Sequence, residues 1–121
     1  MNTINLAEKV RLFTEHWTPK IVGEANGQYV KLAKAQGDMV WHTHDHEEEL
    51  FLVVQGTLMI HFRDRIVALG AGELLIVPKG IEHKTSATAE THFMMIEPKT
   101  TAHTGAVESQ LTVPTAQQVW L

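Results

Sequence analysis

Three histidines within five residues, His42, His44 and His46, are the feature of the sequence with the clearest chemical meaning. In a β-strand over 39–44, His42 and His44 stand two residues apart and project from the same face. Two imidazoles on one face of a strand can chelate one metal ion. Glu49 follows His44 after four intervening residues, so a turn would bring its carboxylate beside the two imidazoles.

A further ligand candidate lies later in the chain, because His83 comes just after the turn sequence Pro78-Lys79-Gly80 and stands at the mouth of a strand. Three imidazoles and one carboxylate make a hard-to-borderline donor set, which suits Fe(II), Mn(II), Ni(II), Cu(II) or Zn(II) and leaves positions open for a substrate. The sequence therefore predicts one divalent metal ion, of unassigned identity, held by His42, His44, Glu49 and His83. The chain has no glycine-rich phosphate loop and no serine-centred nucleophile motif, so nucleotide hydrolysis and acyl-enzyme chemistry are unsupported, and no cofactor-binding residues besides the metal ligands are assigned.

Short apolar segments, separated by Gly, Pro and Asp turns, must position these ligands. The expected strands are 29–32, 39–44, 50–54, 58–62, 66–69, 74–77 and 91–97. Many short strands without helical periods between them indicate an all-β sandwich or barrel.

The 121 residues and 13.6 kDa allow one domain, 1–121. We expect a core barrel over about 29–97, an N-terminal arm over 1–28 with a short helix or extended piece at 5–13, and a C-terminal segment over 98–121.

Several strands are apolar on both faces, as in Leu50–Val54, Leu74–Val77 and Phe93–Ile96. A small barrel has only one inner face, so their outer faces need a cover. A terminal segment of the same chain or a second subunit could provide it, and the sequence favours a two-fold homodimer.

Composition narrows the classes of partner. The chain has 10 Lys plus Arg against 14 Asp plus Glu, a formal charge of −4 and no cysteine. This mild acidity argues against nucleic acid as a partner, and the absence of cysteine excludes disulfides and thiolate metal sites. No signal peptide and no membrane-length apolar stretch is visible. We expect a cytoplasmic protein that binds neither nucleic acid nor membrane.

At the metal-ligand candidates the chain resembles the cupin superfamily, small single-domain type. The first cupin motif is matched by His42-Thr43-His44, four residues, Glu49, six residues and Gly56. Four residues lie between Gly37 and His42, where the motif has five. The second motif is matched by Gly72, five residues, Pro78-Lys79-Gly80, two residues and His83, whereas Ala87 stands where the motif has Asn.

The resemblance implies a double-stranded β-helix, the jelly-roll barrel of two antiparallel sheets, with His42, His44, Glu49 and His83 as metal ligands. It also implies a pocket lined by inward-facing side chains. These are Val40, Phe51 and Val53 with Met94 and Ile96 from the last strand, or Phe93 and Met95 if that strand has the other register.

The function that the resemblance implies is that of a metal-dependent small-molecule enzyme of the dioxygenase, isomerase or lyase class. A non-catalytic module that binds or senses a small metabolite is the alternative, and a metal-free structural dimer is a third. Candidate proton carriers are His46, Glu82 and His92. His16, His61 and His103 are interpreted as surface or internally satisfied histidines.

Overall fold

The computed structural model describes residues 1–105, 109, 112–114 and 118–121. In chain order the elements are α1 Leu6–Val10, β1 Lys20–Ala25, β2 Gln28–Asp38, β3 Glu49–Gln55, β4 Thr57–His61, β5 Ile66–Gly70, β6 Leu74–Val77, β7 Lys84–Pro98 and β8 Val119–Trp120. Within the described ranges, no helix is long and apolar enough to cross a membrane.

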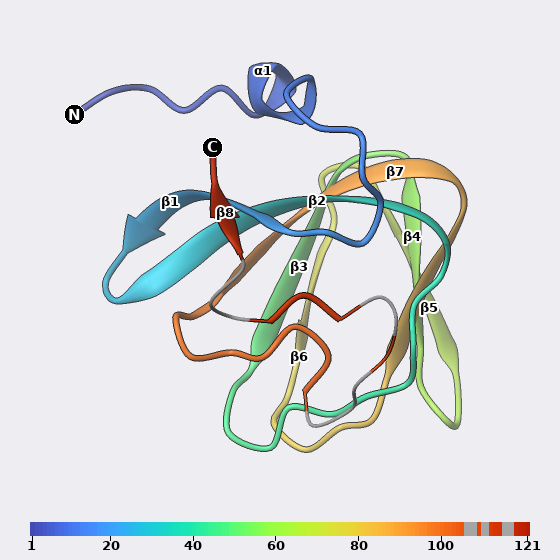
Figure 1. The fold of residues 1–121 in the computed structure, drawn as a ribbon. Coiled ribbons are helices and arrows are strands. Elements are labelled where there is room, and N and C mark those ends of the chain that lie inside the picture. The colour runs from blue at the N-terminus through green and yellow to red at the C-terminus, as the bar shows by residue number, and fades with distance from the viewer. Residues whose placement is uncertain (106–108, 110–111, 115–117) are drawn as a thin grey trace.

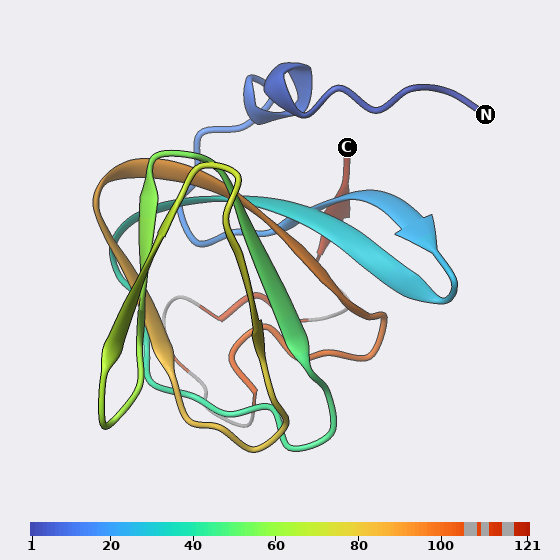
Figure 2. The ribbon, with the colours of Figure 1, turned by 180° about the vertical axis from the view of Figure 1, so that it is seen from behind.

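Two long antiparallel strands, β2 and β7, form the spine of the barrel (Figures 1 and 2). On its other edge, β7 pairs with β4 over Lys84–Ser86 and with β3 from His92 onwards. β4 pairs in turn with β5, and β3 pairs with β6, so two sheets extend from the β2–β7 pair. This arrangement confirms the predicted jelly-roll barrel of two antiparallel sheets.

Most predicted strands agree with the structure, and the segment over 39–44 is the exception. It forms no strand. Its backbone pairs only at isolated positions with the residues just before β7 and with the start of β7, as in the bridge between His42 and His83. The predicted strands 29–32 and 91–97 are parts of the longer β2 and β7. The prediction that His42 and His44 share the face of a strand was therefore wrong, and they project from a loop.

Alternation along β3 and β7 builds the inside of the barrel. Burial alternates along both strands, so that Glu49, Phe51 and Val53 face inward from β3 while Phe93 and Met95 do so from β7. At the turn after β3, Gly56 has a φ of +92° and a Cβ there would lie 2.6 Å from the Thr91 hydroxyl. Only glycine allows this close approach of the β3–β4 turn to β7.

The N-terminal residues pack on the fold instead of extending from it. Phe13 lies in a second apolar cluster with Val22 and Leu32 on the outer side of β2, and Leu6 and Val10 of α1 pack against it. The segment expected as an arm over 1–28 thus contains β1 and covers part of an outer face. The outer side chains of β6 remain about half exposed, 54% for Leu74 and 50% for Ile76.

Candidate metal centre

Two loops that are locked together by backbone hydrogen bonds present the ligand candidates. The His42 N–H donates to the His83 carbonyl over 2.9 Å, and the His83 N–H donates back to His42 over 3.0 Å. Further along, the Gly80 N–H donates to the His44 carbonyl over 2.9 Å. This ladder replaces the missing strand and fixes the positions of the three histidines relative to one another.

Hydrogen bonds fix the tautomers of two imidazoles. Nδ1 of His42 lies 2.8 Å from the carbonyl oxygen of Val40, and Nδ1 of His83 lies 2.9 Å from that of Ile81. Because a carbonyl oxygen only accepts, each Nδ1 carries the proton and each Nε2 keeps a lone pair. A backbone carbonyl that orients a ligand histidine in this way is typical of metal sites.

Glu49 completes the cluster from the first position of β3. Its two carboxylate oxygens lie 3.2 Å from Nε2 of His44 and 3.4 Å from Nε2 of His83. One ligand-type atom from each of the four buried residues lies within 4.8 Å of the others. Among the described residues, the buried Nε2 atoms of His44 and His83 have no hydrogen-bond partner, and a cation would satisfy them. The donor set therefore fits a divalent metal ion.

Burial and mutual charge shift the titration of these groups. Burial lowers the pKa of His42 to about 4. Burial also disfavours the charged forms of His44 and Glu49, but the attraction between these two side chains outweighs it. The pKa of His44 is therefore raised, and the pKa of Glu49 lies well below its ordinary range. Glu49 is thus a carboxylate at neutral pH, as a metal ligand must be.

A buried ion pair lies next to Glu49. Lys31 of β2 is fully buried, and its Nζ lies 2.6 Å from Oε1 of Glu97, which is 2% exposed. Burial and the neighbouring Glu49 raise the pKa of Glu97 well above its usual value. Sequence reasoning missed this pair, although period-2 alternation from Phe93 and Met95 places Glu97 on the inner face of β7.

A cavity of mainly apolar character opens beside the cluster. Its volume is about 30 Å³, and the surrounding gaps, which include open solvent, bring the total empty space to about 340 Å³. The wall consists of Trp17, Pro19, Ala33, Met39, His42, Glu49, Phe51, Thr85, Phe93, Met95 and His103. This lining suits a small, partly apolar ligand.

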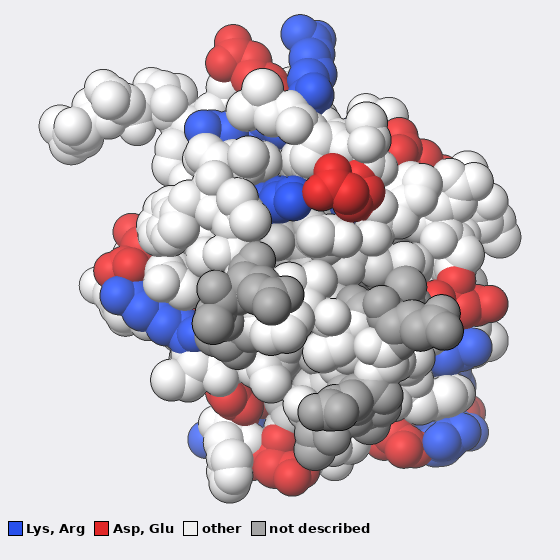
Figure 3. All heavy atoms as spheres, viewed as in Figure 1, with Lys and Arg blue, Asp and Glu red and all other residues white. Residues whose placement is uncertain are grey.

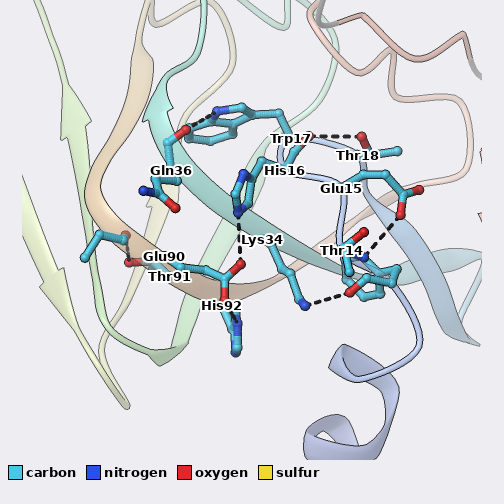
Figure 4. A network of polar contacts seen from close by, with 12 residues as sticks. Thr14, Glu15, His16, Trp17, Thr18, Lys34, Gln36, Glu90, Thr91 and His92 are labelled. Atoms are coloured by element: carbon cyan, nitrogen blue, oxygen red, sulfur yellow. Dashed lines mark hydrogen bonds and ion pairs between the residues drawn. The ribbon is translucent and has the colours of Figure 1, made fainter.

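The N-terminal segment supplies Trp17 to this wall (Figure 4). The indole Nε1–H donates to the Gln36 carbonyl over 3.0 Å, and the Lys34 ammonium donates to the Phe13 carbonyl over 2.6 Å. His16 is joined to Glu90 over 2.9 Å. These contacts fasten the segment to β2 and β7, so Trp17 is a fixed part of the cavity.

Known proteins share this sequence and fold. A family model for the cupin domain matches residues 28–99. The chain belongs to the cupin family. A cupin-2 domain containing protein from Shewanella frigidimarina NCIMB 400 has 46% sequence identity and a TM-score of 0.78, covering 79% of this chain and 94% of that one.

Two further relatives of this cupin extend the comparison. The protein NMB1881 from Neisseria meningitidis has 30% identity and a TM-score of 0.73, over 80% of this chain and 99% of that one. The uncharacterized protein YdbB of Bacillus subtilis (strain 168) is 38% identical over 90 residues, which are 74% of this chain and 79% of that protein.

The residues that line the cavity of this cupin show which face of β7, the last barrel strand, points inward. Phe93 and Met95 line the cavity, whereas Met94 and Ile96 are half buried on the opposite face of β7. The assignment of Met94 and Ile96 to the pocket was therefore wrong.

The residues predicted to line the pocket from β3 and the preceding loop have three different positions. Phe51 lies in the cavity wall. Val53 is buried deeper in the same apolar core. Val40 is half buried outside the wall, and its carbonyl orients His42.

The proposed proton carriers do not lie in the cavity wall. His46 is exposed on the loop, and exposed Glu82 is paired with Arg63. His92 is half buried on the outer face of β7, where its Nε2 lies 3.4 Å from Glu90. His103, interpreted from sequence as a surface or satisfied histidine, does line the cavity of this cupin.

Proposed function

We propose that this cupin is a metal-dependent small-molecule enzyme of the dioxygenase, isomerase or lyase class, using one divalent ion held by three histidines and a glutamate. The observation that supports it best is the buried cluster of His42, His44, Glu49 and His83, with ligand-type atoms within 4.8 Å of one another. The Nε2 atoms of His44 and His83 have no hydrogen-bond partner in the part of the chain that the structure describes. Leaving such atoms buried is costly unless a ligand satisfies them.

A bound divalent ion would supply Lewis acidity toward a carbonyl, hydroxyl or enolate oxygen, and oxygen chemistry if the ion is redox-active. The chain's own residues orient and enclose the ligand. Trp17, Phe51 and Phe93 form an apolar wall that excludes water from the site. Glu97, buried with a raised pKa beside Glu49, can hold a proton close to the cluster.

The lining of the cavity indicates the ligand class. Its mainly aromatic and aliphatic side chains favour a small carbonyl, phenolic or keto-acid compound. On the face in Figure 3, Lys and Arg side chains are interspersed with Asp and Glu. This mixed surface supports a small-molecule ligand and no nucleic-acid partner.

The test begins with the ion found in untagged protein. Iron or copper would direct assays to oxygen consumption with phenolic and keto-acid compounds, and the other metals to deuterium exchange next to a carbonyl, followed by NMR. Turnover that disappears in His42→Ala but persists in His46→Ala supports an enzyme. His46 is the matched control because it is exposed on the same loop. Binding of these compounds without turnover would indicate a sensing module instead.

We also propose that the chain forms a homodimer in the cytoplasm. Support for the dimer comes from the outer face around β6, where Leu74 and Ile76 are about half exposed beside partly buried Leu50. Light scattering on a Leu74→Glu/Ile76→Glu variant would show a monomer if this face joins the subunits, and an unchanged mass would contradict it.

A further inference from the structure

The C-terminal segment after β7 lies against the metal-ligand loop. In Figures 1 and 2 its described residues lie across the barrel from β3 and β6. Thr101 and Thr104 of this segment are fully buried. A Cβ at Gly105 would clash with the carbonyl oxygen of Thr43. The segment therefore contacts the backbone between His42 and His44 directly.

This docking brings His103 into the cavity wall together with His42 and Glu49. The Val113 N–H donates to Nδ1 of His103 over 2.9 Å. Because Nδ1 accepts this hydrogen bond, it carries no proton, and a neutral imidazole then carries its proton on Nε2. Burial lowers the pKa of His103 to about 4, in agreement with a neutral ring. His103 is thus a neutral donor with a fixed tautomer.

His103 stands out from the other polar groups of the wall. His42 and Glu49 belong to the ligand cluster, which leaves His103 and the hydroxyl of Thr85 as the polar side chains of the lining. The remaining lining is apolar. A few convergent polar groups in an otherwise apolar pocket are the ones that fix ligand orientation. A divalent ion at the ligand cluster would add positive charge next to His103, which favours an anionic ligand.

We propose that His103 is a ligand-recognition residue, which donates its Nε2–H to an anionic oxygen, a carboxylate or enolate, of a small compound bound at the metal centre. The inference rests on the proposed function, because the same compound is taken to contact the ion. It adds that the substrate class is a small oxyanion and that the C-terminal segment contributes to specificity.

Two substitutions separate recognition from a structural role. His103→Asn keeps an oxygen near the position of Nδ1, able to accept from Val113, but loses the distal donor. His103→Gln places an amide N–H near the position of Nε2 and loses the proximal acceptor. A residue that merely anchors the segment would be replaced better by Asn, and a recognition residue better by Gln.

The experiment uses Co(II)-loaded full-length protein, titrated with pyruvate and, separately, with imidazole, and followed by visible absorption. Pyruvate can use one carboxylate oxygen for the ion and another for His103, whereas imidazole binds metal without offering any oxygen. Loss of one hydrogen bond to a charged group predicts about tenfold or more weaker pyruvate binding in His103→Asn. His103→Gln should recover most of the affinity, and imidazole affinity should stay within about twofold in both variants.

Pyruvate binding that is unchanged in His103→Asn, or equal loss for pyruvate and imidazole, would overturn the inference while leaving the metal site intact. A wild-type chain that binds no Co(II) would overturn the proposed function and the inference with it. NMR of the wild-type protein loaded with Zn(II) gives a second test that needs no variant. The His103 ring should show its proton on Nε2, with a downfield shift when pyruvate binds, and a proton on Nδ1 would contradict the proposal.

Discussion

Replacing Lys31 by Met tests whether the buried pair behind Glu49 is an ion pair that the fold requires. Lys31 is fully buried, and its Nζ lies 2.6 Å from Glu97, itself 2% exposed. Removing one partner of a buried pair typically costs about 3–5 kcal/mol, because the other charge is left uncompensated. Glu97 already has a raised pKa and can take up a proton instead. We therefore expect the lower end, about 3 kcal/mol.

Urea denaturation at pH 7 in the presence of EDTA measures this effect without any contribution from bound metal. The double variant Lys31→Met/Glu97→Leu should recover to within about 1 kcal/mol of wild type, because an apolar pair of similar volume can replace a buried ion pair. The control Lys79→Met removes an exposed lysine and should stay within about 0.5 kcal/mol. A Lys31→Met variant as stable as this control, or a double variant in which the two losses simply add, would refute the reasoning.

Three further predictions concern the glycines and pH. Gly56→Ala should destabilise by about 2–3 kcal/mol in urea denaturation, since its Cβ would meet a side-chain oxygen at 2.6 Å at a φ of +92°. Gly27→Ala, with a φ of +75° and no atom within 4 Å, should cost only about 1 kcal/mol, and equal losses would contradict the close approach. Gly105→Ala should detach the C-terminal segment, seen as faster limited proteolysis, and a wild-type rate would contradict the docking. Burial lowers the pKa of His42 from 6.5 to about 4, so between these two pH values the unfolded chain binds more protons than the folded chain. The stability that neutral His42 contributes is complete above pH 6.5 and is lost as the pH falls toward 4, up to about 3 kcal/mol. His42→Gln should flatten this part of the denaturation profile in EDTA, even though the raised pKa of His44 acts in the opposite sense.

The ligand cluster could be predicted because covalent spacing and turn residues constrain it strongly. Gly80 turns the chain back so that His83 meets His42, and this pairing holds although the loop over 39–48 forms no strand. The register of β7 could not be predicted, because Phe93–Ile96 is apolar on both faces and hides the period of two. Glu97 was missed for the same reason, as its face depends on that register.

His103 was beyond sequence reasoning for a different reason. It lies in a segment with weak periodicity, and its position depends on contacts that are distant in sequence, such as Gly105 with Thr43 and Val113 with His103. The inward position of Lys31, in contrast, is visible in the sequence. Lys31 alternates with Ala33 and Ala35 along β2 and so shares their inner face, where a charged residue requires a buried partner.

Elemental analysis of the untagged protein, beside its His42→Ala/His83→Ala variant, tests the metal centre directly. About one equivalent of iron, manganese, nickel, copper or zinc is expected in the wild type and none in the variant. His46→Ala, from the exposed part of the same loop, should keep the wild-type content. Equal metal content in the wild type and the double variant, or no metal in the wild type even after reconstitution, would contradict a metal centre at these residues.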